Sequence, residues 1–209
     1  MIPALCLVAA AAAAGERWRV ELAVGTARSF DSTLRVEQEG FPEIALAASW
    51  ATRAFEAPIY YAWRVARADA KGAWAFRFVH HKVHLENAQP DVERFAVSHG
   101  YNLLTLERAT RLSGFEIAAG LGLVIAHPES TVRGQRQSET SGGPFGGGYY
   151  LTGPTLALAA SRRLRLGAHL ALVPELRATL SRAKAPVAGG EASIPNAALH
   201  LAVGLELRF

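Results

Sequence analysis

The sequence has very little cysteine, no long apolar run beyond its N-terminus and no block of like charges. The single cysteine, Cys6, lies in the N-terminal apolar segment, so the rest of the chain can form no internal disulfide bond. After that segment, no apolar run approaches the roughly 18 residues that a membrane-spanning helix needs, which excludes a helical membrane protein. Lys and Arg total 22 and Asp and Glu total 18, but the basic residues alternate with apolar ones. Nucleic acid is therefore not an expected partner.

The N-terminal segment has the composition of a secretory signal. Ile2–Ala14 is apolar, rich in alanine and ends in small residues. These features predict a signal peptide at 1–14 and an exported domain at 15–209. No Lys or Arg precedes the apolar run, so the true start of translation stays open. Without Cys6 the exported domain has no thiol, which suits an envelope compartment.

Beyond the signal, apolar residues alternate with polar or small ones, which is the pattern of β-strands with two unlike faces. Eight segments show this pattern: Trp18–Arg28, Ile59–Arg67, Trp74–Leu85, Arg94–Glu107, Phe115–His127, Tyr149–Ala160, Leu164–Leu180 and Leu199–Phe209. Pro154 predicts an irregularity in its strand. Ser29–Pro58 is ambiguous because it holds two shorter alternating pieces, around Leu34–Glu39 and Ile44–Trp50.

Short and long connections alternate between these segments. Short turns are predicted at Ala68–Gly72, Arg111–Gly114 and Ser161–Arg163, and long loops at Glu86–Glu93, Pro128–Gly148 and Ser181–Asn196. The alternation is typical of an all-β, antiparallel up-and-down transmembrane β-barrel. We expect eight strands, or ten if Ser29–Pro58 contributes a hairpin. A soluble barrel of the lipocalin type is the other interpretation, and it would turn its apolar face inward.

The last segment carries a resemblance to a known class. In Leu199–Phe209 every second residue is apolar, the other face holds His200, Glu206 and Arg208, and the final residue is Phe209. This segment resembles the closing strand of bacterial outer-membrane β-barrels, which typically ends in Phe. The resemblance implies a location in the bacterial outer membrane and contact with its lipids, including lipopolysaccharide. It also implies recognition of Phe209 by the barrel-assembly machinery, and it names no family with a known reaction.

The polar strand faces are predicted to line the barrel. Eight strands enclose a space that side chains can fill, and paired charges there avoid the cost of an isolated buried charge. We expect a salt-bridged plug, with a narrow pore for small solutes as the alternative. The predicted lumen network is Glu21, Arg64, Arg77, Glu116, His169, Glu175, Arg177, His200, Glu206 and Arg208. The lipid-facing aromatic residues are predicted to be Trp18, Trp63, Trp74, Phe76, Tyr101 and Phe209.

Histidines cluster around one predicted hairpin. If Leu85 pairs with Arg94, His81 faces Ser98 and could act as the base for a serine nucleophile. The lipid A deacylases are the natural comparison for an outer-membrane hydrolase of this kind. That family is known for a His and a Ser two residues apart on one strand, and the present sequence has no His-x-Ser. In the assumed register Ser98 also points into the barrel.

A second interpretation of the same hairpin is a basic rim. His80, Lys82, His84 and His99 would bind lipopolysaccharide phosphates at head-group level. His80, His81, His84 and His99 could also be considered as metal ligands, but neighbouring His80 and His81 point to opposite strand faces, so at most three of the four could converge. We predict no metal site and no cofactor. The function that the sequence favours is a non-enzymatic envelope protein with a structural or a lipid- or ligand-contacting role. A lipid A-modifying hydrolase and a narrow pore are the alternatives.

Overall fold

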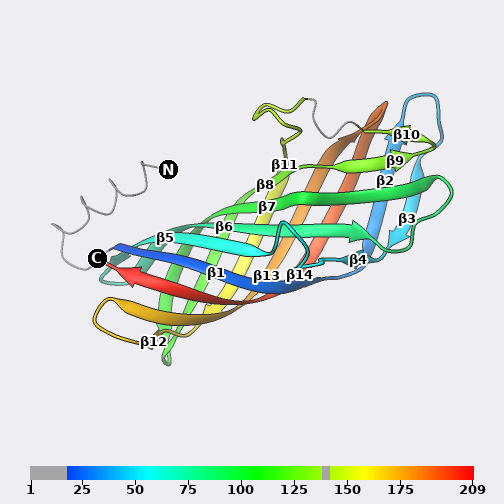
Figure 1. Cartoon of the computed structure of the whole chain (residues 1–209). Helices are drawn as coiled ribbons and strands as arrows, with labels where there is room; N and C mark the ends of the chain where they lie inside the picture. Colours follow the sequence, from blue (N-terminus) through cyan, green and yellow to red (C-terminus); the bar gives the residue numbers. More distant parts are fainter. Residues whose placement is uncertain (1–17, 138–141) are drawn as a thin grey trace.

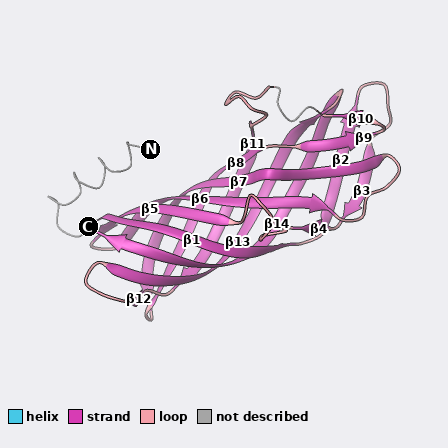
Figure 2. Ribbon diagram, in the orientation of Figure 1, coloured by secondary structure: helices cyan, strands magenta, loops and turns pink. Residues whose placement is uncertain are grey.

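The protein forms one tall barrel of antiparallel strands in a computed structural model that describes residues 18–137 and 142–209 (Figure 1). Figure 2 shows strands and connecting loops throughout this part of the chain. No helix in the described ranges is long and apolar enough to cross a membrane. The signal peptide predicted at 1–14 lies outside the described residues.

Eight strands close the ring, and each pairs antiparallel with the next. They are β1 (Trp18–Ser29), β5 (Tyr61–Asp69), β6 (Gly72–Leu85), β7 (Val92–Leu112), β8 (Phe115–Ala126), β11 (Tyr150–Ser161), β13 (Leu170–Val187) and β14 (Gly190–Arg208). β14 then pairs with β1, from Arg19 opposite Arg208 to Ser29 opposite Ala198. The predicted eight-stranded barrel is confirmed. The predicted irregularity near Pro154 is confirmed as well, by a register shift between Leu151 and Gly153.

The ring has two unlike ends. The turn end carries the connections at 70–71, 113–114 and 162–169, and the loop end carries the four others. The turn predicted at Ser161–Arg163 is too short, because β12 (Leu164–Arg165) folds back on β13 and Leu166 donates its backbone N–H to Leu170. The long strand predicted from Leu164 therefore begins at Leu170.

Around the turn-end half, apolar side chains point outward and polar ones inward. In β14, Leu201, Val203 and Leu205 are exposed, whereas His200 and Glu206 are buried. The soluble-barrel interpretation predicts the reverse. We call the outward residues the apolar belt: Leu22, Val24, Trp74, Phe76, Leu106, Leu121, Leu123, Leu156, Leu158, Leu176, Leu180, Leu201, Val203 and Leu205. Such a band is the outer surface of a transmembrane barrel.

One aromatic residue departs from the predicted lipid face. Tyr101 is fully buried inside the barrel, and its hydroxyl donates to the Ile194 carbonyl at 3.1 Å. The prediction failed because the assumed hairpin register pairs His81 with Ser98. In the structure, Tyr101 lies opposite His81 and faces inward with it. Trp74 and Phe76 lie on the outer face as predicted, each more than half exposed.

At the loop end the wall continues above the belt. β2 (Ser32–Gln38) and β3 (Ile44–Ala48) form a hairpin beside β14, and β4 (Trp50–Ala51) pairs with β6. β9 (Glu129–Val132) and β10 (Gln135–Arg136) extend β7 on the other side. Both pieces predicted as possible strands in Ser29–Pro58 are strands, but they stand outside the ring of eight. The Pro128–Gly148 segment, predicted to be wholly irregular, contains β9 and β10.

The loop predicted at Ser181–Asn196 is wrong. β13 and β14 stay paired from Leu170 opposite Leu207 up to Val187 opposite Gly190. In this upper part the pattern inverts: Arg182 and Lys184 face outward, whereas Ala183 is buried. A search for outward apolar residues misses such a strand, because water and not lipid surrounds it.

The interior of the upper half is an apolar core. It joins side chains from the ring and from the added strands, including Leu34, Val36, Val83, Phe95, Val97, Tyr101, Val132 and Ile194. Leu34, from the β2–β3 hairpin, and Ile194, from β14, have no exposed surface. The hairpin thus serves as one wall of this core, which we call the upper plug.

Ile194→Ala tests the upper plug. We expect it to lower the free energy of unfolding by about 2–5 kcal/mol, because it opens a cavity at a side chain that has no exposed surface. Urea titration of the protein folded in phospholipid vesicles measures the change. The neighbouring control Ser193→Ala, on the outward face, should stay within about 0.5 kcal/mol of the parent. Equal losses in the two variants would contradict the plug.

Candidate functional site

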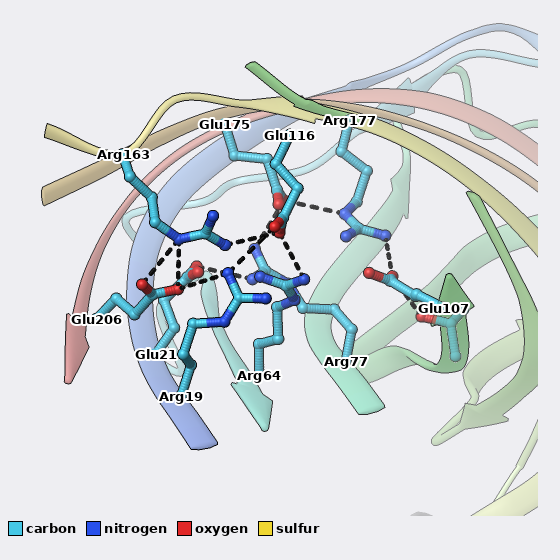
Figure 3. Close-up of polar contacts among 11 residues, drawn as sticks. Arg19, Glu21, Arg64, Arg77, Glu107, Glu116, Arg163, Glu175, Arg177 and Glu206 are labelled. Atoms are coloured by element: carbon cyan, nitrogen blue, oxygen red, sulfur yellow. Dashed lines mark hydrogen bonds and ion pairs between the residues drawn. The ribbon is translucent and has the colours of Figure 1, made fainter. Parts of the chain in front are cut away.

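The turn-end half of the lumen is filled by ten charged side chains (Figure 3). Near the turns, Glu116 accepts from Arg19, Arg64 and Arg163 at 2.7–3.1 Å. Arg163 also binds Glu206 at 2.8 Å. This group holds three arginines and two glutamates.

The second group lies deeper in the lumen and has the opposite balance. Arg77 bridges Glu21 and Glu175 at 2.7 Å each. Arg177 bridges Glu175 at 3.0 Å and Glu107 at 2.7 Å. Two arginines and three glutamates here complement the three and two of the first group, so five positive and five negative charges offset one another. The lumen is therefore filled without net charge from these ten groups.

Strand register and a small residue place these charges. Glu21 lies directly opposite Arg64 on β5 and opposite Glu206 on β14. Gly204, the neighbouring inward position, leaves room for Glu21: a Cβ there would approach its carboxylate to 2.7 Å. Position 204 therefore needs glycine, because any larger side chain would clash with the Glu21 carboxylate.

Seven of the ten predicted lumen residues belong to this network: Glu21, Arg64, Arg77, Glu116, Glu175, Arg177 and Glu206. His200 is buried but lies higher in the barrel. His169 is exposed in the turn before β13, and Arg208 donates to the Ala168 carbonyl at the turn end. Arg19, Glu107 and Arg163 were missed. Arg19 lies two residues before Glu21 on the same strand, so it faces the lumen as well and could have been predicted. Arg163 could not, because it enters the lumen from a turn, where residues do not alternate between two faces.

Above the ions lies a layer of neutral hydrogen bonds around two histidines. His200 is hydrogen-bonded to the Tyr60 hydroxyl through Nδ1 at 3.1 Å and to the Thr179 hydroxyl through Nε2 at 2.9 Å. One ring nitrogen accepts and the other donates. His81 contacts the Ser29 hydroxyl at 3.2 Å, and its ring lies 5.0 Å from that of His200. This layer separates the charged half of the lumen from the upper plug.

The predicted pair of His81 and Ser98 is not assembled. His81 lies opposite Tyr101, and Val83 lies opposite Val97, so three β7 residues, Ser98–Gly100, stand against Lys82 alone. This bulge shifts the assumed register, and His81 bonds to Ser29 inside the barrel. Ser98 bonds instead to Glu129 and to His99.

Ser98, His99 and Glu129 do not form a proton relay either. The Ser98 hydroxyl and a Glu129 carboxylate oxygen both contact the same His99 nitrogen, Nδ1, at 3.1 and 2.9 Å. A catalytic triad uses the two different ring nitrogens for its serine and its acid. The grouping instead brings together side chains that ligate metals, and His127 completes it.

The predicted basic rim is mostly withdrawn from the surface. His80 and Lys82 are buried: His80 binds Asn102 at 2.8 Å, and Lys82 donates to the Glu56 carbonyl at 2.8 Å. His84 is half-buried, and His99 is exposed. The loop after β4 covers this stretch of β6, so these four residues form no continuous exposed rim.

Other basic residues stand where the belt ends. Arg28 follows Leu22, Val24 and Thr26 on the outward face of β1. Arg182 and Lys184 follow Leu180 on β13, and all three basic side chains are exposed. Lys184 is paired with Glu191 at 2.7 Å.

No family model and no curated protein sequence matches the chain. Among solved structures, the outer membrane protein AlkL in lipid bilayers has 14% identity and a TM-score of 0.49, covering 93% of this chain and 90% of its own. OprG, an outer membrane protein of Pseudomonas aeruginosa, has 11% identity and a TM-score of 0.44, covering 93% and 97%. Neisserial surface protein A has 8% identity and a TM-score of 0.42, covering 92% and 97%. These likenesses concern architecture alone.

The decisive features are in the molecule itself: a closed ring of eight strands, short turns at one end and an apolar belt outside. The chain is a small outer-membrane β-barrel. The predicted class and location are thereby confirmed, and the role of the barrel is a separate matter.

Arg77→Met tests the ion network. It leaves Glu21 and Glu175 without this partner, and we expect a loss of about 3–5 kcal/mol in the free energy of unfolding, as for other broken buried ion pairs. Adding Glu21→Gln, which removes the glutamate paired with Arg77 alone, restores four arginines and four glutamates and should recover part of the loss. Urea titration in vesicles compares the variants. If the double variant Arg77→Met/Glu21→Gln were no more stable than Arg77→Met, charge compensation would not be the stabilising effect.

His84 gives the loop end a pH dependence. Burial, with Arg53 and Lys82 nearby, lowers the pKa of His84 to about 4, against about 6.5 in an unfolded chain. Its contribution to stability is therefore complete above about pH 6.5 and is lost as the pH falls toward 4. His84→Gln should reduce the loss of melting temperature between pH 7.5 and pH 5, and His169→Gln should not. Equal pH dependence in His84→Gln and the parent would contradict the assignment.

Proposed function

We propose that this outer-membrane barrel is a closed, non-enzymatic envelope protein that holds a rigid sheet outside the membrane and contacts anionic lipid head groups. In this proposal the loop end faces the exterior and the turns face the periplasm, as in other outer-membrane barrels. The single observation that carries the proposal is the filled lumen.

Three stacked layers support a closed lumen. Near the turns, five arginines and five glutamates span the interior, with Arg77 1% exposed and Glu206 fully buried. Next come the buried histidines, His81 and His200, and beyond them the apolar upper plug. A solute would have to displace paired charges and then an apolar core. The narrow pore is the less favoured alternative for this reason.

The lipid hydrolase is less favoured on different grounds. The hydrolase is predicted to use His81 and Ser98, but His81 bonds to Ser29, whereas Ser98 bonds to His99 and Glu129. His81 has no exposed surface, so it is closed off from lipid. A base must reach the proton that it removes, and this one does not reach Ser98.

The proposed lipid contact moves from the predicted rim to the border of the belt. Arg28 and Arg182 extend outward directly above apolar residues, at the depth where phosphates of an anionic lipid would lie. Lipopolysaccharide is the proposed lipid partner. Phe209, whose backbone pairs with Trp18 at the ring seam, stays the proposed signal for the barrel-assembly machinery.

Planar-bilayer recording tests the closed lumen. We expect the refolded protein to give no stable conductance steps at neutral pH, because the ion network spans the lumen. An open porin inserted in the same bilayers serves as the positive control. A reproducible unitary conductance from the pure protein would overturn the proposal in favour of the pore.

Lipid A retention tests the head-group contact. Native mass spectrometry should show several-fold less bound lipid A in the double variant Arg28→Gln/Arg182→Gln than in the parent. The matched control is Arg35→Gln, an exposed arginine above the belt that pairs with Glu43. Dephosphorylated lipid A should bind the parent and the double variant equally. Equal retention of phosphorylated lipid A by all three proteins would contradict the contact.

A further inference from the structure

Three side chains that bind metals converge where the β7 bulge meets the connection between β8 and β9. β7 pairs with β8 from Tyr101 downward and with β9 at Ala96. His127 and Pro128 alone link these two neighbours of β7, and the His127 N–H donates to the Gly100 carbonyl at 3.1 Å. The bulge therefore brings His99 beside His127 and Glu129. One ligand atom from each of the three residues lies within 4.8 Å of those from the other two.

We propose that His99, His127 and Glu129 form a binding site for a divalent transition-metal ion, with zinc as the first choice, at the loop end of the barrel. Two imidazoles and one carboxylate are a usual donor set for zinc, which binds them at about 2.0–2.2 Å. Donors around a tetrahedral ion stand about 3.3 Å apart at those bond lengths. The three ligand atoms, within 4.8 Å of one another, can reach that spacing through changes in side-chain torsion angles.

An unused buried donor points to a ligand at this place. His127 is 6% exposed, and its Nδ1 has no hydrogen-bond partner in the described structure. Leaving a buried polar atom unsatisfied costs about 1–3 kcal/mol. His99 approaches the same spot, with its ring 5.0 Å from that of His127. A bound cation would use lone pairs from both rings.

The surroundings provide an outer shell and an open side. Tyr149 packs its ring against His127 and donates its hydroxyl to the His99 carbonyl at 3.2 Å. Ser98 bonds to both His99 and Glu129, as partners that orient metal ligands do. The His99 side chain is 52% exposed, so an ion can enter from water. Three protein ligands leave a fourth position for water.

One neighbour opposes metal binding. Arg94 donates to Glu129 at 2.5 Å and competes with a cation for that carboxylate. Its side chain is 56% exposed and can turn into solvent when an ion arrives. The competition makes a specific prediction, because removing Arg94 should tighten metal binding while removing any ligand weakens it.

Isothermal titration of tag-free, detergent-folded protein with zinc chloride tests the site. We expect one zinc ion per chain, an affinity weakened about 10-fold or more by His127→Phe and by Glu129→Gln, and an affinity strengthened by Arg94→Gln. His169→Gln, an exposed histidine at the turn end, is the matched control and should bind like the parent. Cobalt substitution should give the visible absorption of a tetrahedral site in the parent alone among the parent and the ligand variants.

The zinc titration and the conductance recording test different features, so a failure of the zinc site would not affect the proposal of a closed lumen. Heat-modifiable mobility in gels shows whether each variant is folded, so lost binding in a folded variant supports the site. Absence of zinc binding by the parent overturns it. Equal binding by the parent and both ligand variants also overturns it, and assigns the zinc to scattered surface histidines.

Discussion

Each long strand of this barrel must suit two surroundings in turn, lipid along one half and water along the other. β13 shows how it does so without breaking its alternation. In the belt, Leu176 and Leu180 face outward while Arg177 is buried, and above the belt Lys184 faces outward while Ala185 is buried. The two-residue period continues while its polarity reverses. The reversal determines the polarity of the lumen. The lumen is charged where the outer surface is apolar, and it is apolar where the outer surface is polar.

This reversal explains which parts of the fold could be predicted from the sequence. The belt portions follow the rule of apolar outside and polar inside, and all eight ring strands could be predicted from it. The same rule fails above the belt, where Ser181–Asn196 looked like a loop because its buried apolar residues, more than half of them alanine, face inward while charged residues such as Lys184 face outward. The β2–β3 hairpin was ambiguous for the same reason: Leu34 and Val36 serve a core and not a lipid surface.

The lumen residues could be predicted wherever the alternation of side chains along a strand is enough to place them. Glu21, Arg77 and Arg177 lie on inward positions of regular ladders, and parity places them in the lumen whatever their partners. Pairings across strands need the register as well. A hairpin register counted from the loop cannot include the bulge at Ser98–Gly100, and this bulge carries His81 away from Ser98. A glycine at position 100 is a local sequence signal for such a bulge, and its φ is +127° in the structure.

The bulge also links the wall of the barrel to its loop end. Three β7 residues against one leave His99 outside the regular ladder, and the same interruption lets β8 end at Ala126 and β9 begin at Glu129 beside it. A regular β7 would hold His99 at an ordinary position of the ladder, without the three-against-one bulge that brings it beside His127 and Glu129. The feature that removes the predicted catalytic pair is thus the feature that assembles His99, His127 and Glu129. A local irregularity between two well-packed halves is where a closed barrel of this kind can carry a ligand site without disturbing either its ion network or its upper plug.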